Sequence, residues 1–144
     1  MSRASGGFLL VRTGSRRVGL ELRQVIEVIH VSAVHPVPSR EPAMRGVVNV
    51  NGRIMAVVHL GALLEARTCP PASGDIVVVV VMVDGLRVCL EIDAAEVVVR
   101  QPALPVPAGS ALPWAIGVAR HEDGLVPLLD LAALSARFIE VSPA

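Results

Sequence analysis

The chain has 144 residues, 53% of them hydrophobic, and its mean hydropathy of +0.62 is high for a protein that stays in water. Thirteen basic and thirteen acidic residues cancel, so no long-range field attracts nucleic acid or anionic lipid. Aromatic residues make up only 2% of the chain. Too few rings are therefore present for bases to stack on, which argues against a nucleic-acid-binding protein.

Neither the longest apolar run nor the N-terminal segment has the features of a membrane-spanning helix or a signal peptide. The longest apolar run, residues 76–83, is far shorter than the roughly 20 residues of a membrane-spanning helix. Its valines favour a strand, because β-branched side chains fit a pleated sheet and crowd a helix. Residues 1–7 lack the apolar core of a signal peptide. We therefore expect a cytoplasmic protein with no direct membrane insertion.

Strand patterns dominate the first half of the chain. Residues 8–12 and 16–22 flank a turn, and residues 25–31 form a further apolar stretch. This stretch ends in a loop at residues 35–42 that contains three prolines, each of which blocks ladder pairing. We expect three strands followed by an irregular segment.

The clearest local pattern is Asn51-Gly52 between two β-rich runs, residues 47–50 and 53–58. Asn-Gly suits a two-residue type I′ hairpin turn, because both of its central positions need positive φ. Residues 61–67 leave room only for a short helix.

The second half repeats this plan after a linker at residues 68–74. A second proline loop covers residues 102–113, and Asp130 can N-cap a final helix. That helix would carry one apolar stripe of Leu131, Leu134 and Phe138. The strands expected in this half are residues 75–83, 86–92, 96–100, 115–120 and 125–129.

Residues 18–64 and 88–134 read as two degenerate copies of one unit. Leu20 corresponds to Leu90, an offset of 70, and His59 corresponds to Asp130, an offset of 71. The register therefore holds across the whole unit.

Ten short strands in two similar copies predict a mainly all-β protein. We expect two small five-stranded β-barrel subdomains packed side by side, with short helices and a C-terminal helix, since closure removes exposed sheet edges. One domain would span residues 8–136. Its first subdomain would cover about residues 14–67 and its second about 75–130, with the N- and C-terminal segments completing the barrels.

The sequence contains no catalytic or metal-binding pattern. The four histidines match no zinc-site spacing, and no serine or cysteine lies in a nucleophile motif. His59 lies at a strand-to-helix junction, where it can act as a polar cap. Glu21 and Glu91 alternate with buried positions and are expected to face solvent, and Cys69 and Cys89 are expected to be reduced, packed thiols. We expect a non-enzymatic protein with no cofactor and no metal.

Residues 46–60 resemble the chemotaxis coupling protein family, CheW. That family carries a Gly-x-x-Asn-x-Arg-Gly hairpin followed by a Pro-Val-x-Asp-Leu strand end. The resemblance covers roughly residues 8–136 and implies a two-barrel adaptor without catalytic activity. Further segments that match the family pattern in order are residues 8–11, 19–22, 25–28, 36–38, 75–83 and 126–131.

The resemblance implies that the chain links chemoreceptors to a CheA-type histidine kinase in a bacterial chemosensory pathway. The implied partners are the cytoplasmic domain of a methyl-accepting chemoreceptor, the regulatory domain of the kinase, and other CheW-like domains. The receptor is expected to dock near the groove between the subdomains. The residues expected at partner contacts are Val25, Glu27, Gly46, Asn49, Asn51, Arg53 and His59.

Three positions of the first copy depart from the family pattern. Asn51 replaces an arginine, Ala56 a proline and His59 an aspartate, whereas the second copy keeps Pro127 and Asp130. Arginine offers a charged fork of five donors and asparagine offers two uncharged ones, so kinase contact is expected to differ, unless Asn51 only improves the turn. The alternative function is a divergent CheW-like interaction module that binds a receptor or itself without coupling to a kinase. A third alternative is an enzyme or a small-molecule sensor with its site in the groove between the subdomains.

Overall fold

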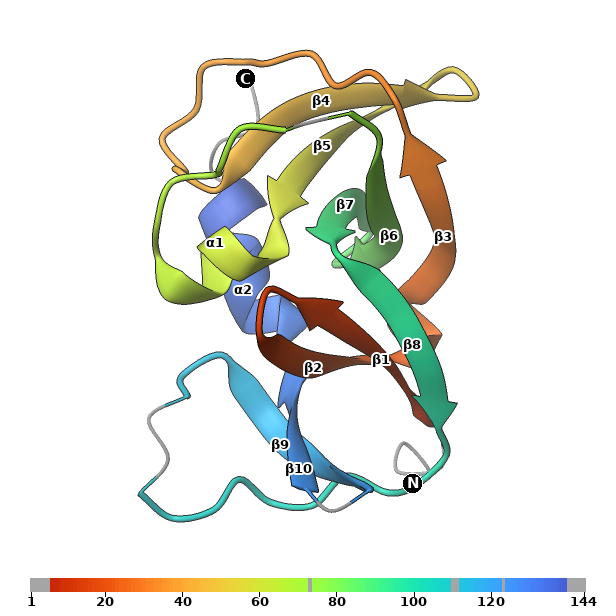
Figure 1. Ribbon diagram of the computed structural model, residues 1–144, viewed down its shortest axis with the longest axis vertical. Helices are drawn as coiled ribbons and strands as arrows, with labels where there is room; N and C mark the ends of the chain where they lie inside the picture. Colours follow the sequence, from red (N-terminus) through yellow and green to blue (C-terminus); the bar gives the residue numbers. More distant parts are fainter. Residues whose placement is uncertain (1–5, 73, 110–111, 123, 140–144) are drawn as a thin grey trace.

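The computed structural model describes residues 6–72, 74–109, 112–122 and 124–139, which form ten strands, two α-helices and a 3-10 turn, η2 (Figure 1). The strands of the first half are β1 (Phe8–Thr13), β2 (Arg16–Glu21), β3 (Val25–Val31), β4 (Met44–Val50) and β5 (Arg53–His59). Those of the second half are β6 (Ile76–Val83), β7 (Leu86–Ile92), β8 (Ala94–Val99), β9 (Ala115–His121) and β10 (Gly124–Leu129). The helical elements are η2 (Leu22–Gln24), α1 (Leu60–Glu65) and α2 (Leu131–Ile139).

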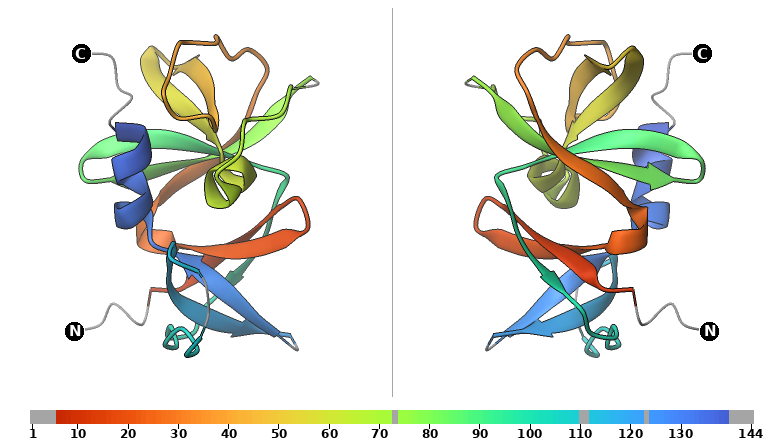
Figure 2. Two further views of the ribbon diagram at one scale, coloured as in Figure 1. Left: turned by 90° about the vertical axis from the view of Figure 1, so that its left-hand side faces the viewer. Right: turned by 90° about the vertical axis from the view of Figure 1, so that its right-hand side faces the viewer.

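The strands form two five-stranded sheets, which lie one above the other in Figures 1 and 2. Sheet A has the order β8-β1-β2-β10-β9, and sheet B has the order β3-β6-β7-β5-β4. The expectation of a mainly β protein with two five-stranded units side by side is confirmed. None of the helices in the described residues has the length and apolar content needed to cross a membrane.

The expectation that each sheet closes into a barrel is wrong. In sheet B, the gap between the edge strands is spanned by one isolated bridge, between His35 and Val47, and in sheet A the corresponding bridge joins Leu104 and Val118. His35 directly precedes Pro36 in the first proline loop, and Leu104 directly precedes Pro105 in the second. Because proline lacks an N–H, the ladder cannot continue from these bridges, and the sheets stay open.

The division into subdomains at residues 14–67 and 75–130 also does not match the sheets, because each sheet takes strands from both segments. The turn η2 carries the chain from sheet A to sheet B, and the short connection from β7 to β8 carries it back. As a result, β3 pairs with β6 and β8 pairs with β1. The β1–β2 hairpin of the first copy thus joins β8, β9 and β10 of the second copy in sheet A. In the same way, the β6–β7 hairpin of the second copy joins β3, β4 and β5 of the first copy in sheet B.

The repeat itself holds at the level of individual strand pairs. β5 pairs in parallel with β7 through Val57 and Cys89, and β10 pairs with β2 through Leu128 and Gly19, the equivalent positions. The β-bulge in β3 beside Ile26 also recurs at the equivalent place in the pairing of β8 with β1. Since the irregularities coincide as well as the strands, the two copies share one backbone plan.

Each sheet curls around a small core of its own, and the two sheets share a larger core. Successive residues of β6 alternate between them: Val78 and Val80 lie in the inner core of sheet B, whereas Val79 and Val81 lie in the shared core. This burial on both faces explains why β6 is an unbroken apolar run. The shared core also holds Leu131 and Leu134 of α2, as the apolar stripe predicts; the side chain of Phe138 lies outside the described residues.

Candidate partner-binding surface

All seven residues expected at partner contacts lie on sheet B or at its ends, but they do not form one surface. Asn51 belongs to the β4–β5 turn and His59 to the opposite end of β5. Val25 and Glu27 lie on β3, the other edge of the sheet. The residues therefore separate into three places, which differ in exposure and chemistry.

Gly46 is buried and cannot offer a side chain to a partner. Its φ is +151°, and a Cβ built on it would lie 2.2 Å from the carbonyl oxygen of His35. The glycine lets this carbonyl approach β4, where Val47 donates a 2.9 Å hydrogen bond to it. The role of Gly46 is thus to permit the bridge across the open edge of sheet B.

Val25 and Glu27 face opposite sides of sheet B, because the bulge between them shifts the register. Val25 pairs with Val81 and packs against the shared core, whereas the exposed Glu27 pairs with Val80, whose side chain lies on the inner face. Only Glu27 is therefore free to meet a partner directly.

The β4–β5 turn has the geometry that its sequence predicts. Asn51 and Gly52 have φ values of +53° and +84°, and Val50 pairs with Arg53 on either side of them. The Oδ1 atom of Asn49 accepts a 2.8 Å hydrogen bond from the backbone N–H of Gly52. Asn49 therefore stabilises the turn, which leaves Asn51 and Arg53 as exposed groups at its tip.

A shallow groove of about 380 Å³ lies along the open edge of sheet B, between β3 and β4. Asn49 and Asn51 line its β4 side, and Ile29 and Val31 line its β3 side. The groove is where the barrel would have closed. It mixes apolar side chains with two uncharged amides.

The opposite end of sheet B contains a nearly buried ion pair that the sequence did not predict. The guanidinium of Arg45 donates from Nε to Glu91 Oε1 at 2.5 Å and from Nη2 to Oε2 at 3.1 Å, and the side chains are 10% and 12% exposed. Arg45 Nη1 also donates to the carbonyl of Pro70 at 2.8 Å. The expectation that Glu91 faces solvent is wrong, since β7 is an inner strand covered on both faces.

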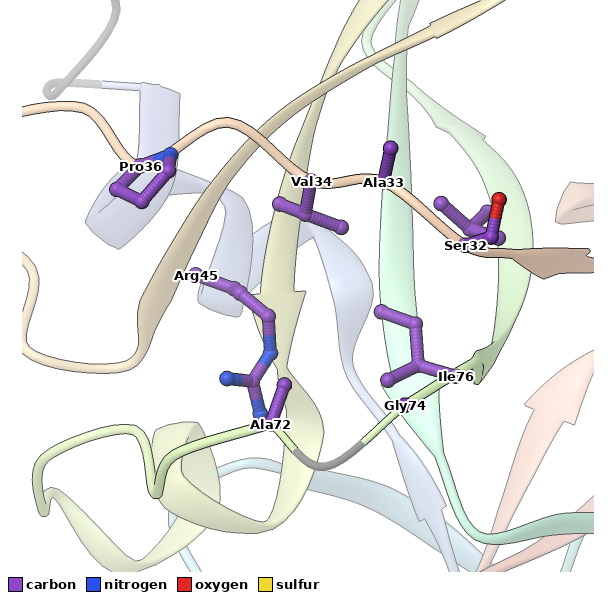
Figure 3. A pocket seen from close by; sticks show the side chains of 9 residues that line it. Ser32, Ala33, Val34, Pro36, Arg45, Ala72, Gly74 and Ile76 are labelled. Atoms are coloured by element: carbon purple, nitrogen blue, oxygen red, sulfur yellow. The ribbon is translucent and has the colours of Figure 1, made fainter.

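Arg45 also separates two hollows at this end. Figure 3 shows it reaching from β4 toward Ala72, beneath the segment that carries Ser32 to Pro36, in a hollow of about 330 Å³. His59 lines the second hollow, of about 300 Å³, together with Glu91 and Asp93. A clue to this pair was available in the sequence: Arg45 is a cation two residues before the β-rich run of residues 47–50.

The repeat gives each exposed position of sheet B an equivalent on sheet A, and one pair of equivalent faces differs in chemistry. On sheet A, Arg17 Nε lies 2.7 Å from Glu96 Oε1, Arg12 Nε lies 3.7 Å from Glu96 Oε2, and Arg17 Nη1 lies 3.4 Å from Glu122 Oε1. Ion pairs thus link β8, β1, β2 and the β9–β10 turn. The equivalent positions on sheet B are Ile26, Met82, Arg87 and Asn51.

We call Ile26, Met82 and Arg87 the β3–β6–β7 face. Ile26 and Met82 are 38% and 39% exposed, and Arg87 pairs across the ladder with Met82. Within the described part of the chain, Arg87 makes no ion pair. Exposed apolar groups beside an unpaired cation are typical of a surface that meets another protein.

The described residues offer little for catalysis. Among them, no three His, Cys, Asp or Glu side chains are grouped to hold a metal ion. Burial raises the pKa of the Cys69 thiol, and burial together with nearby Glu27 raises that of Cys89 to about 11. Both thiols are therefore protonated at neutral pH, whereas a nucleophilic cysteine needs the thiolate.

Comparison with known proteins agrees with this arrangement of two sheets. Among solved structures, the scaffolding protein TtCheW from Thermoanaerobacter tengcongensis is similar, with a TM-score of 0.78 and 20% sequence identity over 90% of this chain and 92% of that chain. A search of curated protein sequences gave no match. The family model for the CheW-like domain matches residues 7–137, nearly the whole length of both copies. The chain therefore belongs to the CheW-like domain family.

Proposed function

We propose that the chain is a non-enzymatic adaptor of a bacterial chemosensory pathway, which links the cytoplasmic domain of a chemoreceptor to a CheA-type histidine kinase. Membership of the CheW-like family supports an adaptor, and the related Thermoanaerobacter tengcongensis protein is described as a scaffolding protein. The observation that carries the proposal is the difference between the sheets. Sheet A covers with ion pairs the same face that sheet B leaves apolar.

The partner surface that we propose is the β3–β6–β7 face with Glu27 beside it on β3, and the tip of the β4–β5 turn, at the far edge of the sheet, is a second, separate contact. Ile26 and Met82 supply apolar area, and Glu27, Arg53 and Arg87 supply charges that have no ion pair among the described residues. Unpaired charges at the rim of an apolar patch favour specific encounter with a charged partner. Val25, which packs against the shared core, and the buried Gly46 contribute no side chain to this surface.

Copying the ion pairs of sheet A onto sheet B tests this surface. In the double variant Ile26→Glu with Met82→Arg, the new Glu can pair with the new Arg and with Arg87, as Glu96 pairs with Arg12 and Arg17. We expect the variant to fold normally. Its affinity for the partner that binds the β3–β6–β7 face should decrease at least tenfold, because apolar contact is replaced by paired charge. Calorimetric titration against a receptor cytoplasmic fragment and against the kinase regulatory domain measures the change.

The reverse change on sheet A is the matched control. Glu96→Ile with Arg12→Met makes the equivalent face apolar and should leave both affinities within twofold of those of the unchanged protein. Equal loss of affinity in both double variants would contradict a surface restricted to sheet B. Binding of neither partner at tens of micromolar by the unchanged protein would overturn the proposed function.

A second candidate function, a module that binds a receptor or itself without a kinase, is favoured by Asn51. Its φ of +53° suits asparagine, so the turn accounts for this residue without a role in binding. Receptor binding or self-association with no kinase binding would support this second function.

If the lost charge weakens kinase binding, Asn51→Arg should tighten it about tenfold, by adding a charged donor fork at the turn tip. The turn conformation is less favourable for arginine, so the free energy of unfolding should fall by about 1 kcal/mol. Asn51→Ala carries the same backbone strain without the charge and is the control. Equal kinase affinities for the Arg and Ala variants would show that charge at position 51 is irrelevant.

A further inference from the structure

The two copies cap their helices with the same hydrogen bond but with different chemical groups. In α2, Oδ1 of Asp130 accepts a 3.1 Å hydrogen bond from the backbone N–H of Ala133. In α1, Nδ1 of His59 accepts a 3.0 Å hydrogen bond from the backbone N–H of Ala62, the equivalent residue. An imidazole thus caps the helix of the first copy, and a carboxylate caps the helix of the second.

The two acceptors respond differently to acid. A carboxylate accepts hydrogen bonds at any pH above its pKa, near 4. An imidazole accepts only while it is neutral, because both ring nitrogens of the protonated form are donors. Acidification through the range where histidine titrates therefore removes the acceptor of α1 and leaves that of α2 in place.

The surroundings of His59 favour its neutral form. Burial is the largest cause that lowers the pKa of His59 below its ordinary 6.5, and the cations Arg45 on β4 and Arg67 after α1 lower it further. Glu91 on β7 and Asp93 after it oppose this effect. Two other carboxylates lie nearby: Glu65 on α1, whose own pKa responds to His59, and Asp75, which lines the same hollow.

The two carboxylates that raise the pKa of His59, Glu91 and Asp93, are already engaged. Glu91 accepts two hydrogen bonds from Arg45, and Oδ2 of Asp93 accepts a 2.6 Å hydrogen bond from the backbone N–H of Gly14. A protonated His59 would therefore compete with existing donors for them. Glu91 and Asp93 therefore offer a protonated His59 little compensation for the lost cap.

The helix that depends on this cap is short. α1 has six residues and ends at Glu65, its C-cap Ala66 has a φ of +54°, and the backbone N–H of Arg67 donates a 3.0 Å hydrogen bond back to the carbonyl of Ala62. Beyond it, the N–H of Cys69 donates to the carbonyl of Pro42 at 2.8 Å. Isolated helices of this length do not persist, so α1 relies on its caps and its packing.

We propose that His59 is a pH-sensitive cap that stabilises the first turn of α1 when it is neutral and loosens it when it is protonated. Folding favours the neutral ring, so the unfolded chain binds this proton more readily. The stabilising effect is complete above about pH 6.5 and is lost as the pH falls below that value. The proposal is independent of which partner the protein binds.

Amide hydrogen exchange of the full chain, measured by NMR at pH 7.5 and pH 5 and corrected for intrinsic exchange rates, tests it. Protection of the Ala62 amide should fall about fivefold on acidification, the equivalent of the roughly 1 kcal/mol that an N-cap contributes. The Ala133 amide is the internal reference and should change less than twofold. In His59→Asp, which carries the acceptor of the second copy, protection of Ala62 should be the same at both pH values.

Equal protection of Ala62 at both pH values in the unchanged protein would overturn the proposal, as would the same pH-dependent loss in His59→Asp. If the added negative charge near Glu91 prevents His59→Asp from folding, His59→Asn supplies an uncharged acceptor at the same place. It should also remove the pH dependence.

Discussion

Gly46→Ala should lower the free energy of unfolding by about 3 kcal/mol or more, the largest effect that we expect from any single methyl group in this protein. Two causes add. The φ of +151° is unfavourable for any residue with a Cβ, and that Cβ would lie 2.2 Å from the carbonyl oxygen of His35. The backbone of His35 cannot move away as freely as a side chain could, so the new methyl group would break the bridge between His35 and Val47. Urea denaturation followed by circular dichroism measures the change.

Two other glycines serve as controls. The equivalent residue in the second copy, Gly117, would place its Cβ 2.9 Å from the Leu104 carbonyl without a positive φ, so Gly117→Ala should cost less. Gly52 has a φ of +84° with nothing within 4 Å of its Cβ position, and Gly52→Ala should cost about 1 kcal/mol for strain alone. If Gly46→Ala lowers the free energy of unfolding no more than Gly52→Ala does, the close approach of the His35 carbonyl does not contribute to the loss of stability.

Arg45→Met should lower the free energy of unfolding by about 3 kcal/mol or more, because it leaves the carboxylate of Glu91 buried without its partner. The change also removes the hydrogen bond that holds Pro70, so the segment after α1 loses an attachment to β4. Replacing both partners, Arg45→Met with Glu91→Leu, should recover most of the loss, since apolar groups of similar size need no partner. A double-mutant cycle from urea denaturation measures the coupling.

The repeat supplies the matched control for this cycle as well. Glu21 is the equivalent of Glu91, and its partner Arg23 lies 3.1 Å away; the Arg23 side chain is 63% exposed and the Glu21 side chain 18%. Breaking this pair with Arg23→Met should cost less than about 1 kcal/mol, because solvent screens the exposed guanidinium of Arg23 and can reach the carboxylate once that side chain is removed. Similar losses for Arg45→Met and Arg23→Met would mean that burial does not strengthen the dependence of Glu91 on its partner.

The features that the sequence predicted well are those decided by neighbouring residues. Asn51-Gly52 forms the two-residue turn because only its own two φ angles must be positive. Asp130 caps α2 because its side chain reaches the N–H three residues on. The valine run of residues 76–83 is a strand for reasons of side-chain shape.

The features that the sequence did not predict are contacts between residues far apart in the chain. Glu91 follows an alternating pattern that is typical of a strand with one solvated face, but β7 lies inside sheet B, where the charge needs Arg45. Gly46 matched a family position expected at a contact, yet its conformation is required by a carbonyl eleven residues earlier. Neither the neighbour nor the burial is visible in the local pattern.

By itself, the sequence determined the number and type of the strands, the turns between them, the caps of both helices and the existence of a repeat. All of these depend on side-chain period, on φ preference and on hydrogen bonds within a few residues. Tertiary structure alone decided that β3 leaves its own copy to pair with β6, that the barrels stay open, and that an ion pair is buried at Glu91. The reason is that strand partners are chosen by the direction of short connections such as η2 and by the packing of both sheets on one shared core.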